Sequence, residues 1–428
     1  MIKPELLMGV SSFSGAIAAV NNGANAVYFG IKGYNMRDLG TNFKLNELSK
    51  LMKYLHENNA RGYLALNTII YDEELVKVEK IIKSAKKARV DAIIASDLGV
   101  MSLVKKHEIE LHVSTQASVS NFTALEQYGK LGAKRIVLAR ELSLIQIKKL
   151  VKKARGIGIE IEVFVHGAMC ISVSGRCFLS HEIFGRSANR GECLQPCRRA
   201  FFLPEKTLGK NELSVKAFFV DGDKPDYVKK EILVQGNTIL SAKDLKTIDF
   251  LDKLVATGVV SLKVEGRTKP NDYVAVVARS YSSAINAIME KKFSNKKILE
   301  WNTELGKVYN RKFSSGFYLQ KPSGKDLTDI QGSNQTKKRA QIGLVKKYYV
   351  KINVVEIKLS FDLKIGDKII IEGKNTFIEQ EIVSMQSNHK ELTIAKKGDL
   401  VGVKISGRAR VNDVVFKVID NDKFSKKK

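Results

Sequence analysis

The first 167 residues alternate between short apolar runs and segments with helical spacing. Apolar runs without alternation predict strands buried on both faces, as in a parallel sheet. The predicted strands are Glu5–Val10, Ala26–Ile31, Gly62–Asn67, Asp91–Ser96, Leu111–Gln116, Arg135–Arg140 and Ile159–Gly167. The amphipathic helical segments between them include Leu45–Leu55, Glu73–Ala88 and Leu142–Ala154.

An eighth strand, Val260–Glu265, is followed by a helical pattern over Tyr273–Met289. Eight repeats of strand and helix predict an α/β fold, and they fit a TIM-type (β/α)8 barrel better than an open sheet. The first strand is not followed by G-x-G-x-x-G, which weakens a dinucleotide-binding interpretation. We expect this barrel to span residues 1–295.

A long detour separates the seventh strand from the eighth. In TIM barrels the loops after the strands form the active face, so an insertion at about 168–240 is expected to cap the mouth of the barrel. Within it, Leu203–Gln235 mixes charge and glycine and predicts an inserted hairpin or flap.

After the barrel the pattern changes. Residues 296–335 are expected to be a linker, with aromatic anchors in Trp301–Gly324. Residues 336–420 are expected to form a C-terminal all-β barrel, because turn signals with Gly and Asp separate β-branched runs. The stretch L-K-I-G-D-K-I-I-I-E-G, with the later G-D-L-V-G-V-K-I, resembles the second β-barrel domain of translation GTPases. Residues 421–428 form a basic tail.

The chain is strongly basic, with 72 Lys and Arg against 45 Asp and Glu and a net charge of +27. This balance favours a polyanionic partner, either nucleic acid or an anionic membrane surface, unless the excess is merely solvated. Residues 331–428 alone hold 21 basic and 11 acidic residues, which favours tRNA or rRNA docking on the C-terminal domain. No apolar run is long enough to predict a membrane span. The N-terminus has no secretory pattern, so we expect a cytoplasmic protein. The sequence predicts no oligomeric state.

All four cysteines lie in one short window, at Cys170, Cys177, Cys193 and Cys197. A disulfide pair would need an oxidising compartment. A zinc site usually has two close pairs; Cys193 and Cys197 fit that spacing, whereas Cys170 and Cys177 do not. Four thiolates also suffice for a [4Fe–4S] cluster, whose spacings vary more. Spacing alone leaves a cluster and zinc open.

The cysteines belong to two motifs, F-V-H-G-A-M-C-I-S-V-S-G-R-C-F-L-S and N-R-G-E-C-L-Q-P-C-R. These resemble the signature blocks of the collagenase-like peptidase family (unknown catalytic type, family thirty-two). Several members of that family are better described as RNA hydroxylation proteins, which add a hydroxyl to a pyrimidine of tRNA or rRNA. Relatives act in oxygen-independent ubiquinone hydroxylation. The resemblance implies an iron–sulfur insertion, with a [4Fe–4S] cluster ligated by Cys170, Cys177, Cys193 and Cys197.

Candidate site residues follow from the ends of the predicted strands, where TIM barrels carry their active sites. The polar residues at those ends are Asn67, Asp97, Gln116, Arg140, Glu141, His166 and Glu265. Tyr34-Asn35-Met36-Arg37 resembles the N-M-R block of the family, and Glu265-Gly266-Arg267 matches its E-G-R block. We expect catalytic roles for His166, Glu162, Glu265 and Arg267, and substrate contacts from Asn35, Arg37, Asn67, Gln116 and Arg140.

Arg37, Arg140 and Arg267 could together hold a small dicarboxylate co-substrate, since guanidinium groups grip carboxylates bidentately. The hydroxylating relatives are thought to use prephenate, which is such a dicarboxylate. Two plainer interpretations remain. The Arg and Glu residues could form ion pairs that only tie loops together, and His112 and His166 could be core histidines.

Two other functions stay open. A peptidase would need a nucleophile; Cys170 with His166 is one candidate pair, and it excludes Cys170 as a cluster ligand. H-E-I-E-L-H at His107–His112 is not a zinc-peptidase motif, because its histidines are five apart and run into a strand. There is also no G-x-S-x-G elbow. The non-enzymatic alternative is an RNA-binding assembly factor with a structural cluster.

Overall fold

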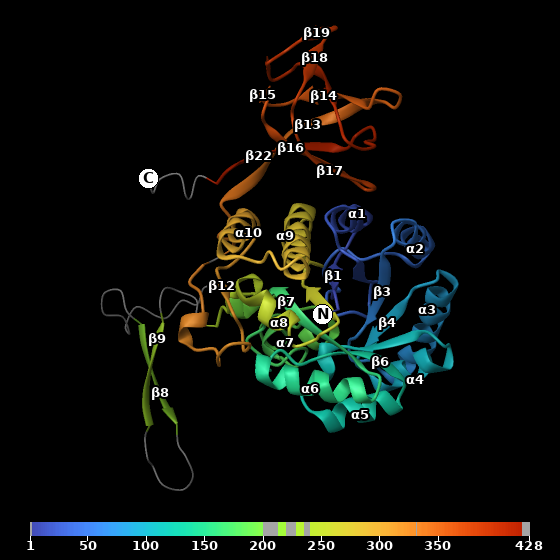
Figure 1. Cartoon of the computed structure of the whole chain (residues 1–428), viewed down its shortest axis with the longest axis vertical. Coiled ribbons are helices and arrows are strands. Elements are labelled where there is room, and N and C mark those ends of the chain that lie inside the picture. The colour runs from blue at the N-terminus through green and yellow to red at the C-terminus, as the bar shows by residue number, and fades with distance from the viewer. Residues whose placement is uncertain (1, 200–212, 220–227, 235–239, 331, 422–428) are drawn as a thin grey trace.

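In this computed structural model, the described residues are 2–199, 213–219, 228–234, 240–330 and 332–421. Eight parallel strands form the centre of the molecule (Figure 1). They are β1 (Glu5–Gly9), β2 (Ala26–Gly30), β3 (Arg61–Leu66), β4 (Ala92–Ala95), β5 (Glu110–Val113), β6 (Ala133–Val137), β7 (Glu160–Gly167) and β11 (Ser261–Val264).

The strands close into a barrel because β11 pairs in parallel with both β1 and β7. Ser261 is opposite Glu5 on one side and opposite Glu162 on the other. The predicted TIM-type barrel is therefore confirmed, and its last strand comes only after the long detour.

Helices cover the outside of this barrel, as expected for a parallel sheet with both faces buried (Figure 1). They are α1 (Phe13–Asn21), α2 (Leu48–Glu57), α3 (Leu75–Lys87), α4 (Leu98–Lys106), α5 (Phe122–Lys130), α6 (Leu144–Gly156), α8 (Leu251–Val255) and α9 (Asn271–Met289). Several begin at a side-chain cap: the Ser12 hydroxyl accepts a hydrogen bond from the Gly15 N–H, and Ser143 with Gln146 forms a capping box on α6.

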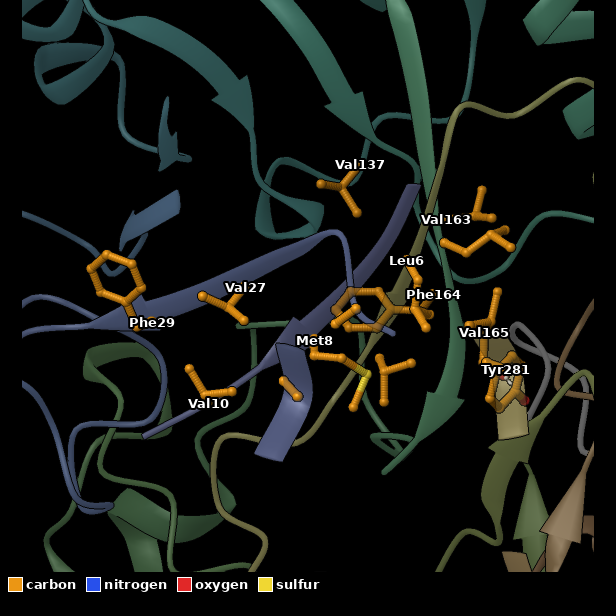
Figure 2. Close-up of a cluster of buried hydrophobic side chains, with 14 of the residues drawn as sticks. Leu6, Met8, Val10, Val27, Phe29, Val137, Val163, Phe164, Val165 and Tyr281 are labelled. Carbon is orange, nitrogen blue, oxygen red and sulfur yellow. Dashed lines mark hydrogen bonds between the residues drawn. The ribbon is translucent and has the colours of Figure 1, made fainter. Parts of the chain in front are cut away.

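The main core lies between the strands and this helical layer. Leu6 and Met8 of β1 and Val27 and Phe29 of β2 belong to this core and are among the side chains drawn in Figure 2. Their neighbours in sequence, such as Leu7 and Tyr28, belong to a second, smaller cluster. Because successive side chains of a strand point to opposite faces, this second cluster fills the inside of the barrel.

The inside of the barrel also holds a charged layer. Lys263 of β11 donates to Glu162 of β7 at 2.7 Å, and Arg135 of β6 lies 3.4 Å from Glu162 and 2.5 Å from Glu5. Glu162, Arg135 and Lys263 are all buried. Each charge therefore has an opposite partner, as buried charges require.

The detour between β7 and β11 contains the short helix α7 (Leu179–Phe184) and β10 (Asp244–Lys246), which pairs antiparallel with β7. The hairpin predicted in Leu203–Gln235 is present as β8 (Leu213–Phe219) paired antiparallel with β9 (Val228–Val234). The rest of that stretch lies outside the described residues.

Residues 296–335 are not a simple linker, which corrects the expectation from sequence. They include most of α10 (Asn295–Lys307), whose Trp301 and Leu305 are buried, and β12 (Phe313–Ser314), which pairs with β10. Tyr318 is buried, and its hydroxyl donates to the Phe164 carbonyl at 2.5 Å. Hydrophobic contacts of this segment with the barrel explain the difference.

The C-terminal part forms antiparallel sheets, so an all-β domain is confirmed; its likeness to a translation-GTPase domain stays a prediction. The basic tail lies almost wholly outside the described residues. The strands are β13 (Lys337–Tyr349), β14 (Val354–Leu359), β15 (Leu363–Lys364), β16 (Lys368–Gly373), β17 (Thr376–Glu381), β18 (Met385–Ser387), β19 (Lys390–Glu391), β20 (Ile394–Ala395), β21 (Leu400–Lys404) and β22 (Val414–Asp420).

This domain packs against α1 and α9 (Figure 1). Ile370 and Phe377 join the hydrophobic core of the barrel, and Arg279 of α9 pairs with Glu379 at 2.9 Å. None of the helices in the described ranges is long and apolar enough to cross a membrane.

Candidate active site

A pocket with a volume of about 180 Å³ lies where the carboxyl ends of the barrel strands meet the cysteine-rich segment. It brings together most of the residues singled out from sequence. Those that line it are Arg37, Asn67, Gln116, Arg140, Glu265, Arg267, Cys170, Cys177, Cys193 and Cys197. Asn35, Glu162 and His166 are not among its lining residues.

Arg37 and Glu265 form the central ion pair of the pocket. Arg37 Nη2 donates to Glu265 Oε2 at 2.6 Å, and the nearby Glu265 raises the pKa of Arg37. Burial alone would raise the pKa of the Glu265 carboxyl, but Arg37, Arg267 and Arg140 outweigh burial and lower it. Glu265 therefore stays ionised and holds several cationic groups at one place.

Two asparagines accept hydrogen bonds from the Arg267 guanidinium. Its Nη2 donates to Oδ1 of Asn35 and to Oδ1 of Asn42, both at 2.7 Å. Asn35 Oδ1 also accepts from the Arg37 backbone N–H at 2.9 Å. Asn35 was expected to contact substrate; it instead shapes the loop and orients Arg267. Burial lowers the pKa of Arg267 to about 10.

Arg140 is the third guanidinium of the pocket. Its Nη1 donates to the Ala168 carbonyl at 2.7 Å, and its guanidinium lies 3.8 Å from the centre of the Phe164 ring. Its Nε is buried without a hydrogen-bond partner among the described residues, as are Arg267 Nε and the Tyr28 hydroxyl. Buried donors without partners are uncommon, so they favour a polar ligand in this pocket.

The amides at two strand ends differ in how firmly they are held. Asn67 Nδ2 donates to the Ser114 hydroxyl at 3.0 Å, and Asn67 Oδ1 accepts from the Met36 N–H at 3.3 Å. The Gln116 side-chain oxygen is buried and has no hydrogen-bond partner among the described residues. The Asn67 side chain is thus fixed in the wall of the pocket, whereas Gln116 Oε1 is available to accept a hydrogen bond.

The lining residues that were missed from sequence include Tyr28, Lys263 and Lys269. Lys263 lies 4.3 Å from the centre of the Tyr28 ring, and a lysine within the apolar strand V-S-L-K-V-E was a usable signal. Lys269 Nζ lies 3.2 Å from the centre of the Tyr309 ring. Burial, with Arg311 and Arg198 nearby, lowers the pKa of Lys269 to about 7, although Asp244 acts in the opposite direction.

The cysteine-rich segment is fixed to the barrel by backbone contacts. The Gly191 carbonyl accepts from the Asp38 N–H at 3.0 Å. Gly191 has φ +88°, and a Cβ there would lie 2.0 Å from the Asn35 carbonyl oxygen, so only glycine allows this approach. The Asn189 side chain accepts from the Cys177 N–H at 3.0 Å, which joins the two cysteine blocks.

All four cysteines are unpaired and line the same pocket. Burial raises the pKa of the Cys193 and Cys197 thiols, and the neighbouring cysteines raise it further. Four thiols at one pocket are a donor set that suits a cationic centre, because metals bind the thiolate. Within the described ranges, no three His, Cys, Asp or Glu side chains form a group that could hold one metal ion.

Glu162 and His166, both expected to be catalytic, lie elsewhere. Glu162 is in the charged layer near the amino-terminal end of β7, paired with Lys263. His166 packs among Tyr273, Tyr281 and Phe313, and burial lowers its pKa to about 3.

A neutral core histidine is therefore present at position 166. In the part of the chain that the structure describes, no hydrogen bond joins it to Cys170. Among the other strand-end residues, Asp97 caps α4 by accepting from the Val100 N–H, and Glu141 is exposed.

The family model "Peptidase family U32" matches residues 11–328, which include every barrel strand after β1 and the cysteine-rich segment. The chain is a member of peptidase family U32. The family expected from the cysteine motifs is thus confirmed.

Its relatives within family U32 carry different names. The chain is 41% identical to an uncharacterized protease of Methanocaldococcus jannaschii, covering 97% of this chain and 98% of the relative. It is 34% identical to a collagenase of Porphyromonas gingivalis, covering 96% and 97%. It is 32% identical to tRNA hydroxylation protein P1 of Bacillus subtilis, covering 87% and 84%.

Proposed function

We propose that this protein is an RNA-modifying enzyme that hydroxylates a pyrimidine of tRNA or rRNA without molecular oxygen. The observation that carries the proposal is that four cysteines and four arginines line one pocket at the mouth of the barrel. A relative named as a tRNA hydroxylation protein, similar over most of both chains, supports the RNA substrate. The net charge of +27 supports it further. An enzyme with this substrate would act in the cytoplasm.

The cofactor in this proposal is a [4Fe–4S] cluster held by Cys170, Cys177, Cys193 and Cys197. Such a cluster would supply one-electron chemistry beside the bound substrate. The support for this cofactor is that all four thiols line the same pocket. Zinc remains the alternative.

The protein's own residues would bind and orient the reactants. Arg140 and Arg267 each keep a buried Nε without a partner among the described residues, and Arg37 completes the cationic wall. These groups suit a small dicarboxylate co-substrate such as prephenate. Lys269 Nζ, with its pKa near 7, can give or take a proton at neutral pH.

The target base would have to be unpaired or flipped to reach the pocket. The experiment is analysis of the nucleosides of total tRNA and rRNA from a deletion strain. We expect one hydroxylated pyrimidine to disappear and to return with the wild-type gene, but not with Arg140→Ala. A matched control is Leu131→Ala, at an exposed position of the barrel just before β6. An unchanged nucleoside profile in the deletion strain would overturn the proposal.

Peptide hydrolysis is the second candidate, because two relatives are named as a collagenase and a protease. A Cys170–His166 pair is a poor basis for it, since His166 is enclosed by aromatic rings. Gelatin cleavage by iron-free protein, abolished by one nucleophile substitution, would favour this function. RNA binding with no altered base would instead favour an assembly factor with a structural cluster.

A further inference from the structure

Exposed apolar side chains gather around the cysteine-rich segment. Six of them form what we call the rim: Tyr71, Ile171, Val173, Phe178, Ile183 and Phe184. Phe178 is 73% exposed, more than any other aromatic side chain that the structure describes. It lies between Cys177 and Leu179, which both line the pocket. A gathering of exposed apolar side chains usually marks a surface where something binds.

Arginines are interleaved with the aromatic residues of the rim. The Arg199 guanidinium lies 4.7 Å from the centre of the Phe184 ring, and the Arg190 guanidinium lies 4.7 Å from the centre of the Tyr71 ring. Arg176, next to Cys177, is exposed and makes no ion pair with any residue in the described ranges. Flat aromatic and guanidinium faces beside a positive charge are the combination that binds unpaired nucleotides.

We propose that the rim is a stacking platform for the unpaired RNA bases on either side of the target nucleotide, with Phe178 as its main stacking residue. This inference rests on the proposed RNA substrate and names the surface that receives it. A base that enters the pocket pulls its two neighbours to the mouth, where they lose their own stacking partners. The rim offers replacement partners at that position.

Charge favours RNA over the other partners that an apolar surface can have. The segment between Cys170 and Arg199 contains Arg176, Arg186, Arg190, Arg198 and Arg199. Only two of these, Arg186 and Arg190, are paired with carboxylates among the described residues. Arginine beside aromatic rings suits phosphates and bases together.

The test measures RNA binding by the full-length, cluster-loaded protein. The probe is a short, fluorescently labelled pyrimidine oligoribonucleotide, and its anisotropy is followed at one fixed salt concentration. Phe178→Ala is expected to weaken binding by about 5-fold to about 100-fold, which is the usual effect of losing one stacking side chain. Phe178→Trp keeps a flat ring and should bind within about 2-fold of wild type. Leu131→Ala removes an apolar side chain that is 41% exposed just before β6, at the end of the barrel opposite the pocket, and it should leave binding unchanged.

A second readout does not depend on affinity. Replacement of Phe178 by photoreactive benzoylphenylalanine should crosslink the oligonucleotide under near-ultraviolet light, whereas the same replacement of Leu131 should not. If wild type binds the RNA but Phe178→Ala binds equally well, and no crosslink forms at position 178, the platform is wrong and the proposed function stands. If wild type does not bind RNA at all, both fail. If wild type instead binds anionic lipid vesicles and Phe178→Ala does not, the rim is a membrane contact and the inference is overturned.

Discussion

An ion pair between Arg37 and Glu265 links an early loop of the barrel to its last loop at the mouth of the pocket. Arg37 follows the second strand, Glu265 follows the eighth, and their side chains meet at 2.6 Å. Glu265 is buried and is surrounded by Arg37, Arg140 and Arg267. One carboxylate therefore offsets the repulsion among three guanidinium groups.

Removal of this carboxylate should destabilise the protein strongly. Glu265→Ala leaves buried arginines without their counter-charge, and breaking a buried pair in this way costs about 3–5 kcal/mol. Urea unfolding followed by circular dichroism measures the change in free energy of unfolding. The matched control is Glu57→Ala, whose partner Lys53 lies 3.8 Å away on the surface of α2, and it should change stability little. Equal effects of the two substitutions would contradict the role given to Glu265.

Glu162 should make stability depend on pH in the acid range. Burial alone would raise its pKa, but Lys263, Arg135 and His112 outweigh burial and lower it from its ordinary value of 4.5 to about 2. A carboxyl with a lowered folded-state pKa adds stability above about pH 4.5, and loses it as the pH falls towards 2. The difference amounts to roughly 3 kcal/mol.

We expect Glu162→Gln to be less stable than wild type at pH 7 and to show a smaller loss on acidification. Unfolding free energies measured from pH 7 to pH 3 test this. Glu300→Gln, at an exposed position on α10, serves as the control and should follow the wild-type curve. A Glu162→Gln curve parallel to wild type would show that another group is responsible.

The cysteines should be equivalent as ligands. Anaerobically purified wild type is expected to be brown, with about four irons and four sulfides per chain, and each single Cys→Ala variant should lose most of both. Ser172→Ala, in the same segment, should keep them. Colourless, iron-free wild type, with reactivity concentrated on one thiol of low pKa, would refute the cluster and direct attention to peptide hydrolysis.

Lys269 should be unusually reactive near neutral pH. Burial lowers its pKa to about 7, so a large part of its amine is neutral and nucleophilic there. Competitive labelling with an amine reagent, read by mass spectrometry, should give a midpoint near pH 7. An added lysine peptide, whose amine titrates at about 10.4, is the internal standard. Asp244 raises the pKa of Lys269, so Asp244→Asn should move the midpoint lower still. A midpoint that coincides with the peptide would contradict the prediction.

The barrel strands were predictable because each is a short apolar run, and the ends of those runs carry Arg140, Gln116 and Glu265, which line the pocket. The face of β7 on which the His166 side chain lies was not predictable. The pairing of β7 with β11 shifts register between Lys263 and Val264, so that Val264 is opposite His166. An irregularity of this kind changes the face on which a side chain lies, and nothing in the local residue pattern announces it.

Two other differences have similar causes. Glu162 is a residue type that can act in catalysis, but it lies near the amino-terminal end of β7, away from the pocket. Its partner Lys263 comes from a strand about a hundred residues away. The helix α10 is largely polar, with Trp301 and Leu305 as its buried positions. Its packing on the barrel depends on neighbours that sequence spacing does not reveal.

The barrel closes by pairing β1, which ends at Gly9, with β11, which begins at Ser261. During synthesis β1 therefore keeps one edge unpaired until almost two-thirds of the chain has been made. An unpaired strand edge is a template for association with other chains, so this interval is when the nascent protein is most exposed to aggregation. All four cysteines leave the ribosome within the same interval, before the strand that completes the ring.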